Sequence, residues 1–282
     1  YLDEKTYRPE DPNSTKIPND KDIWPNIEAG LKFAYDNLPE RQTQPGRVTK
    51  WAAAATLAKA QMYQKKWADA KTLLTAIVGS GRYRLMERYH DNFRATMNNN
   101  AESVFEVQNS VNDGAGGGEN GNNGATLNYP YAGPTTCCGF FQPSQNLVNA
   151  YKTGANGLPL LTTFNDSDVA SDQGIEANQP FTAYSGPLDP RLDWTVGRRG
   201  IPFLDWGPMP GKSWIRDQGN GGPYVSKKHL FYRSDVGSNT FALNPRLNAN
   251  NTRLIRYAHV LLMLAECEIE LGNLEPARTL VN

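Results

Sequence analysis

Histidine and cysteine are both scarce in this chain of 282 residues, which has three of each. His90, His229 and His259 lie far apart, and none belongs to the H-E-x-x-H pattern of a zinc hydrolase. An odd number of cysteines is not the disulfide framework of a small secreted domain, and no C-x-x-C pair indicates zinc. We therefore expect no metal and no cofactor. The adjacent Cys137 and Cys138 either form a vicinal disulfide or stay reduced.

The chain also lacks net charge and long apolar runs. Lys+Arg and Asp+Glu balance at 29 each, so we expect no nucleic acid and no anionic membrane surface as the main partner. No apolar run approaches the ~20 residues that a membrane span needs. The sequence starts without an initiator Met, a signal peptide or a lipid-attachment cysteine, and it stops within a predicted helix. We therefore expect it to be part of a longer protein.

Sequence patterns of catalysis are missing as well. The chain has no G-x-S-x-G nucleophile elbow. Gly116–Gly121 has the form G-x-G-x-x-G, but an Asn-rich segment follows it instead of a helix, so no helix N-terminus is available to bind phosphate. The same segment lacks the regular acidic spacing of a calcium loop. We interpret it as a flexible loop and predict no catalytic residue.

Helix patterns are present near both ends of the chain. The Ala-rich segment Val48–Gln64 and the segment Trp67–Val78 predict one helical pair. Regular helix resumes at Leu254, where apolar residues recur at the spacing of one helix face. They are Ile255, Val260, Leu261, Leu264, Ala265 and Ile269. Gly272 is a typical helix stop, and Pro276 stands where the next helix begins.

The two helical pairs share an alanine pattern. Ala58 is followed twelve residues later by Ala70, and Ala265 stands in the same relation to Ala277. Alanine at a helix crossing lets two helices approach closely, as in tetratricopeptide (TPR) repeats. Ordinary helical hairpins are the alternative. The predicted fold is mainly α, a TPR-type scaffold of helical pairs with a long irregular, loop-rich insertion that contains short strands.

The predicted organisation is one partial domain over residues 1–282. Residues 22–85 hold the N-terminal helices with one TPR-like pair, and residues 253–282 hold a second pair that is cut short. Between them, residues 86–252 form the insertion, in which Ser103–Gln108 predicts a strand and Gln145–Tyr151 a short helix. Insertions on a rigid scaffold commonly carry binding function, so we expect the ligand there.

Aromatic residues are dense within this insertion. Three of the six tryptophans lie within Trp194–Trp214, among glycines and prolines. An exposed indole can cover the apolar C–H face of a sugar ring, while carboxylate, amide and guanidinium groups bind its hydroxyls. The candidate glycan-binding residues are Trp206, Trp214, Asp205, Arg216, Asp217 and Tyr224, with Gln218 and Asn220 as further polar groups.

A small core beneath long loops is the alternative for these rings. It is favoured for Trp194, whose surroundings alternate like a strand, and for a second cluster. That cluster consists of Tyr129, Tyr131, Phe140 and Phe141. Asp205 and Asp217 could also be the paired carboxylates of a secreted glycoside hydrolase, whose separation the sequence does not show. Asp189 before Pro190 is better explained as turn chemistry.

Four segments in this order resemble the SusD/RagB-like nutrient-binding lipoproteins. They read KWADAKTLLTAIVGSGRYRL, NAESVFEVQNS, DPRLDWTVGRRG and RLIRYAHVLLMLAECEIELGN. The resemblance runs from Trp24 to Asn282; each motif is weak alone, and their order carries the likeness. It implies a non-catalytic protein on the cell outer membrane, surface-exposed and lipid-anchored through a part that this chain does not contain. Such proteins hold glycan, or peptide in the RagB branch, against a SusC-like TonB-dependent transporter.

Two interpretations from other classes stay open beside this one. A glycoside hydrolase would release sugar from a polysaccharide, and a TPR adaptor would retain peptide in its helical groove. Peptide binding of the RagB kind is a third and closer alternative. The sequence names neither the glycan nor its linkage.

Overall fold

The computed structural model describes residues 2, 5–18, 20–135 and 137–282. These residues divide into two compact units, each described here by itself. The helical unit comprises residues 1–85, 101–105 and 254–282, and the loop unit comprises residues 86–100 and 106–253. Among the described residues, helices make up most of the regular secondary structure, so the mainly helical fold class is confirmed.

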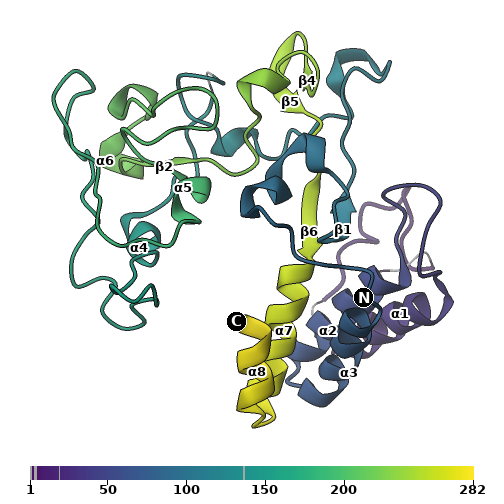
Figure 1. Ribbon diagram of the computed structural model, residues 1–282. Coiled ribbons are helices and arrows are strands. Elements are labelled where there is room, and N and C mark those ends of the chain that lie inside the picture. The colour runs from purple at the N-terminus through teal and green to yellow at the C-terminus, as the bar shows by residue number, and fades with distance from the viewer. Residues whose placement is uncertain (1, 3–4, 19, 136) are drawn as a thin grey trace. The chain divides into compact units, whose positions relative to one another are not determined.

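Five helices form the helical unit (Figure 1). They are α1 (Trp24–Asn37), α2 (Lys50–Tyr63), α3 (Trp67–Gly79), α7 (Tyr257–Glu270) and α8 (Leu274–Val281). Helix α3 packs against both α2 and α7, while α1 packs on α2 and α8 packs on α7. Two helical hairpins, α2–α3 and α7–α8, therefore occur where the sequence predicted helical pairs. Their assignment as TPR repeats stays a prediction.

Small side chains allow the close packing of these helices. The Thr49 hydroxyl caps α2 by accepting a hydrogen bond from the Ala52 N–H at 3.4 Å. The run of alanines that follows is buried, and Ala58 and Ala70 are fully enclosed. Larger residues fill the space around them, among them Leu74, Ile77 and Val260. The core of this unit lies where α3 contacts α2 and α7.

The predicted start of the C-terminal helix at Leu254 is wrong. Thr252–Arg256 is strand β6, which pairs with β1 (Ser103–Val107), and α7 begins only at Tyr257. The backbone N–H of Tyr257 donates to the carbonyl oxygen of Glu102 at 2.8 Å, and the Glu102 carboxylate lies 3.0 Å from the Arg256 guanidinium. These bonds hold the chain in extended form up to the helix start.

One residue of the predicted helix face is misplaced as well. Ile269, predicted on the core face, is exposed.

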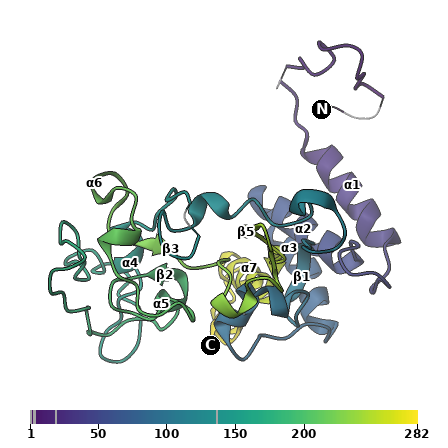
Figure 2. The same ribbon diagram turned by 90° about the horizontal axis from the view of Figure 1, so that it is seen from above.

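Short elements separated by long irregular segments make up the loop unit (Figure 2). Its α-helices are α4 (Gln145–Asn149), α5 (Leu192–Thr195) and α6 (Gln218–Gly221). Its strands are β2 (Val196–Gly197), β3 (Val225–Ser226), β4 (Thr240–Phe241) and β5 (Asn244–Asn248). Strand β2 pairs antiparallel with β3, and β4 with β5. Its 3-10 turns are Tyr89–Phe93, Ala95–Met97, Gly116–Gly118, Thr126–Asn128, Lys212–Trp214 and Arg233–Asp235.

Two small hydrophobic clusters hold the loops of this unit. The first cluster contains Tyr129, Phe203, Met209, Ile215, Val225, Leu230 and Phe231. The second contains Val148, Val169, Leu192, Val196 and Tyr224. Gly197 lies between Phe203 and Val225, where a Cβ atom would come within 2.6 Å of each side chain. Only glycine fits there, so the backbone of β2 can approach the first cluster.

Buried polar side chains replace regular hydrogen bonding in part of the loop unit. The carboxylate of Glu106 lies 3.4 Å from the Arg253 guanidinium, and both side chains are almost fully buried. The Asn251 amide donates to the same carboxylate at 2.8 Å, and the Asn250 amide donates to the Phe93 carbonyl at 2.8 Å. The first bond pairs buried side chains with each other, and the second satisfies a buried backbone carbonyl. Within the described residues, no helix has the length and apolar character of a membrane span.

Candidate functional site

Trp206 is a half-buried anchor of the first cluster. Its indole Nε1–H donates to the Phe231 carbonyl at 3.1 Å, and the two rings meet edge to face with centres 6.0 Å apart. The indole N–H, with which a ligand would form a hydrogen bond, is therefore already bonded within the protein. This arrangement gives Trp206 a packing role, with only part of its ring facing outward.

Trp214 is also half-buried and supports a neighbouring loop. Its ring stands edge-on to Phe203, with centres 5.3 Å apart, and its carbonyl accepts a hydrogen bond from the Tyr131 N–H at 3.1 Å. Gly133 lies directly on the indole, and a Cβ atom there would overlap the ring. Trp214 thus joins the first cluster to the segment that carries Tyr131.

The two candidate carboxylates both bind backbone amides. Asp205 accepts from the N–H groups of Arg233 at 2.6 Å and Ser234 at 3.0 Å. Burial alone would raise the pKa of Asp205, but these amide bonds outweigh it and hold the pKa below its ordinary value. Asp217 caps the short helix α6 by accepting from the Gly219 N–H at 2.8 Å. Asp205 therefore holds the turn at Arg233–Asp235 against its own loop, and Asp217 fixes the start of α6.

Tyr224 belongs to the interior of the second cluster. It is only 2% exposed, and its hydroxyl donates to the Gln145 side chain at 3.0 Å. Burial raises the pKa of this phenol. Gln218 is buried too, and its side-chain oxygen accepts from the Gly174 N–H at 2.9 Å, whereas Asn220 is exposed. Tyr224 and Gln218 therefore face the protein and not the solvent.

Exposed rings gather instead on a segment that the sequence predicted to be packing. Tyr131, Phe140 and Phe141 are 50%, 46% and 76% exposed, and only Tyr129 of that cluster is buried. The packing prediction is therefore wrong for three of the four rings. Together with Arg216, the three exposed residues are called the aromatic loop surface.

Backbone bonds hold this surface in place. The N–H groups of Gly139 and Phe140 donate to the carbonyls of Tyr129 and Leu127, at 3.0 and 2.9 Å. Gly139 has a φ of +70°, and a Cβ atom there would lie 2.8 Å from Cβ of Arg216. No other residue fits at this position without displacing its neighbours.

Arg216 links the parts of the aromatic loop surface. Its guanidinium carbon lies 4.5 Å from the centre of the Phe140 ring and 5.8 Å from that of Tyr131. Its Nη1 donates to the Cys138 carbonyl at 3.1 Å, and within the described residues no carboxylate pairs with it. Most of its donors are thus open to a ligand. The sulfur atoms of Cys137 and Cys138 are placed together as a vicinal pair.

One sequence signal could have found these rings. Phe140 and Phe141 are consecutive in a segment bounded by Gly139 and Pro143, with no helical or alternating pattern around them. Neither ring therefore belongs to an apolar face of a helix or strand, which would give it a buried side. Of the three tryptophans in the dense region, in contrast, two pack against the first cluster and Trp194 belongs to neither cluster.

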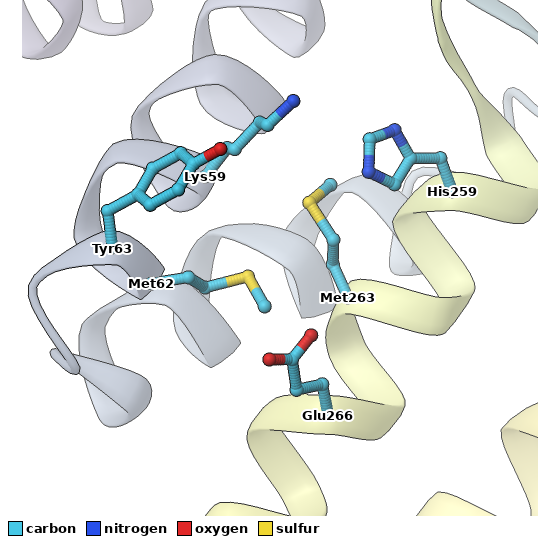
Figure 3. A pocket seen from close by; sticks show the side chains of 6 residues that line it. All are labelled: Lys59, Met62, Tyr63, His259, Met263 and Glu266. Carbon is cyan, nitrogen blue, oxygen red and sulfur yellow. The ribbon is translucent and has the colours of Figure 1, made fainter.

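The helical unit contains a separate pocket of about 220 Å³ between α2 and α7. Its lining residues are Lys59, Met62, Tyr63, His259, Met263 and Glu266 (Figure 3). The Glu266 carboxylate points toward the two methionines, while Lys59 and His259 lie at the other end. Burial, followed by the charges of Lys59 and Arg256, lowers the pKa of His259. Within the described part of the chain, no group of three or more His, Cys, Asp or Glu side chains could hold a metal ion.

Comparisons with known proteins bear on this geometry. The sequence model of the SusD family matches residues 101–282. The SusD-like protein P25 of Formosa agariphila is 26% identical over 258 residues, which cover 89% of this chain and 44% of that protein. The relatives that match most of this chain are about twice as long, so the chain spans about half of their length.

Solved structures show the same fold. A SusD-like carbohydrate binding protein from Bacteroides fragilis aligns with a TM-score of 0.63 and 20% identity, over 92% of this chain and 49% of that chain. A laminarin binding SusD-like protein aligns with a TM-score of 0.56 and 23% identity, over 92% of this chain and 52% of that chain. The mainly helical fold agrees with these structures. Since the family model covers well over half of the sequence, the chain belongs to the SusD family.

Proposed function

We propose that this protein binds a glycan without catalysis, on the aromatic loop surface formed by Tyr131, Phe140, Phe141 and Arg216. The observation that carries the proposal is the exposure of three rings, two of which lie beside one guanidinium that, within the described residues, no carboxylate neutralises. Membership of the SusD family supports it, as do the carbohydrate-binding and laminarin-binding proteins that share the fold.

The chemistry of the aromatic loop surface suits a sugar. Large apolar rings in contact with water are unfavourable unless a ligand covers them, and the C–H face of a pyranose can do so. The guanidinium fork of Arg216 donates several hydrogen bonds in one plane, which fits vicinal hydroxyls. Because the rings stand on a loop pinned by backbone bonds, little ordering is needed on binding.

The residues first chosen from the sequence receive different roles in this proposal. Arg216 contacts the glycan directly, and Trp214 supports the loop and offers the open part of its ring. Trp206, Asp205 and Asp217 stabilise the loops through the hydrogen bonds described above. Tyr224 belongs to the interior and contacts no ligand.

Family membership also supports a wider proposal about the whole protein. It would sit on the outer-membrane surface, held by a lipid anchor outside this chain, and pass its glycan to a SusC-like TonB-dependent transporter. In this scheme the loop-rich segment 86–252 carries the ligand, and the helices of residues 22–85 and 253–282 form the scaffold. The same exposed rings could receive peptide side chains, as in RagB-like peptide binding, so peptides belong in the first screen.

Catalysis is the function that the local bonds favour least. A glycosidase needs one carboxyl group that can give a proton and a second that acts on the sugar. Asp205 is held in its ionised form by two amide bonds, and Asp217 caps a helix. We therefore assign these residues to structure and propose that the protein is not a glycoside hydrolase.

Affinity gel electrophoresis tests the proposal directly. Wild type and Phe141→Ala migrate through gels that contain laminarin, xyloglucan or another neutral polysaccharide, and immobilised peptides are screened in parallel. We expect at least one glycan to retard the wild type and Phe141→Ala to lose most of that retardation. Tyr63→Ala, which removes an exposed ring from the helical unit, is the matched control and should migrate like the wild type. Retention by peptides alone, or equal retardation of the wild type and Phe141→Ala, would reject the glycan site.

A further inference from the structure

The loop unit has a second exposed aromatic site, centred on Trp194. The alternating pattern placed this residue in a strand with a core role, but it lies in helix α5 and is 41% exposed. The buried ring of His90 stacks on its indole, with centres 4.7 Å apart and planes inclined by 26°. His90 is 3% exposed, so it forms a flat support on the inner side of the indole.

One lysine lies beside the indole, and a second lies over the ring of Phe93, whose centre is 6.3 Å from that of His90. The buried ammonium of Lys227 is 5.5 Å from the centre of the Trp194 ring and donates to the carbonyls of Asp193 at 2.5 Å and Pro202 at 2.6 Å. The half-buried Lys228 lies over the ring of Phe93, at 4.8 Å from its centre. Within the described residues neither lysine forms an ion pair with a carboxylate. Carbonyls and rings stabilise a cation but leave its positive charge in place.

The nearest acids are already paired with other cations. Asp193 accepts two hydrogen bonds from Arg198, at 2.7 and 2.9 Å, and Asp91 lies 4.0 Å from Arg94. Their charges are therefore largely compensated. The two lysines keep a local excess of positive charge, although the chain as a whole is neutral.

The pKa of His90 indicates the sign of the local electrostatic field. Burial, followed by the positive charges of Lys227 and Arg94, lowers its pKa to about 3. Each of the charged neighbours that contributes to this lowering is a cation or a second histidine. The imidazole therefore stays neutral near pH 7 and adds no charge of its own. A ligand on the indole would lie in a positive field.

We propose that the exposed face of Trp194 binds an anionic sugar, whose ring covers the indole and whose carboxylate or sulfate is attracted by the positive charge of Lys227 and Lys228. The indole accounts for the sugar, since its face matches the C–H face of a pyranose. The uncompensated lysines account for the negative charge, which they attract in a site partly shielded from water. This site rests on the proposed glycan-binding function but is formed by other residues than the aromatic loop surface.

A pair of oligosaccharides with the same backbone separates the effect of ligand charge from that of the sugar ring. Isothermal titration calorimetry at low ionic strength compares a hexamer of galacturonic acid with its methyl ester, which has the same backbone and no charge. We expect the acid to bind and the ester to bind at least about fivefold more weakly. A sulfated carrageenan oligosaccharide is titrated as well, and binding of this probe in place of the uronate assigns sulfate as the anionic group.

Substitutions locate the binding. Trp194→Ala should weaken the acid about tenfold or more, as truncation of an aromatic anchor commonly does. Lys228→Gln should weaken it less and reduce its dependence on salt. Lys212→Gln removes another lysine of the loop unit, which pairs with Glu176, and should leave the affinity unchanged. Circular dichroism and melting confirm that each variant is folded.

Repeating the titrations in a Phe141→Ala background separates this site from the aromatic loop surface. The loss caused by Trp194→Ala should persist there, whatever becomes of neutral glycan binding. Equal affinity for the acid and its ester would overturn the selection for charge. If hexaglutamate binds as tightly as the hexamer of galacturonic acid, the site accepts acidic peptide, and the assignment to a sugar is overturned. Unchanged binding of the anionic sugars in Trp194→Ala would overturn that assignment as well.

Discussion

The guanidinium of Arg216 lies 4.5 Å from the centre of the Phe140 ring and donates to the Cys138 carbonyl at 3.1 Å. One side chain thereby fixes both a ring and the backbone of the aromatic loop surface. The planar guanidinium suits this double role because it can stack on a ring while it donates hydrogen bonds at its edge. A lysine ammonium at the same place would lose the planar contact.

Replacing Arg216 by lysine should therefore weaken glycan binding although the charge is kept. The expected loss is about fivefold to thirtyfold, which corresponds to ~1–2 kcal/mol of stacking and hydrogen bonding. Calorimetry with the glycan found in the gel screen measures it. Arg233→Lys, an exposed change beside Asp205 in the same unit, is the matched control and should keep the wild-type affinity. Full affinity in Arg216→Lys would mean that the guanidinium does not touch the ligand.

Trp206 and Phe141 should respond in opposite ways to truncation. Trp206→Ala removes a ring packed on Phe231 and its N–H bond to the Phe231 carbonyl, so we expect it to destabilise the loop unit by about 3 kcal/mol. Phe141 is mostly exposed, so Phe141→Ala should leave the melting temperature nearly unchanged and reduce binding. Melting curves and glycan titrations of both variants measure the contrast. A stable Trp206→Ala protein that fails to bind would return Trp206 to the binding site.

The helices were predictable because each carries its own signal. Thr49 caps α2, and Gly272 with a φ of +81° follows the end of α7, as local chemistry predicts. The start of α7 was missed because Ile255 fits a helix face and a buried strand position equally well. The pairing of β6 with β1 decides between them, and β1 lies far away in the sequence, where a local pattern carries no information about it.

The exposure of single rings was not predictable in the same way. Trp194 and Trp206 are both tryptophans in the same aromatic-rich region, yet Trp206 finds a carbonyl partner and Trp194 stays open. The difference depends on which distant segment lies beneath each ring, Phe231 in one case and His90 in the other. Composition placed the aromatic region correctly in the loop unit but could not rank its rings.

The helical scaffold makes its own prediction about alanine. Ala70 is fully enclosed where α3 meets its neighbours, so Ala70→Leu should overpack the contact and lower the free energy of unfolding by ~1–3 kcal/mol. Ala277→Leu should do the same at α8, where this alanine is buried. Ala68→Leu, an exposed position on α3, is the control and should have little effect. Near-wild-type melting of both buried variants would contradict close crossing at these alanines.

His90 should make the loop unit sensitive to acid. Its pKa in the folded protein is about 3, because of burial and then of nearby positive charges, against 6.5 for an ordinary histidine. Between these two values the unfolded chain binds a proton that the folded protein does not, so stability is lost as the pH falls from about 6.5 toward 3. A histidine whose pKa differs by one between the folded and unfolded states contributes about 1.4 kcal/mol to this loss once the pH is below both pKa values.

His90→Phe removes this titrating group while it keeps a flat ring against Trp194. We expect the variant to lose less stability than the wild type between about pH 6.5 and pH 4, measured by urea unfolding at each pH. The comparison cancels the titration of carboxylates that both proteins share, since only residue 90 differs. Burial lowers the pKa of Lys227 to about 8, so this lysine stays charged over the range and contributes a constant background. If both proteins lose stability equally as the pH falls, His90 is hydrated or charged in the folded state. The positive field beside Trp194 would then be weaker than the cations around His90 imply.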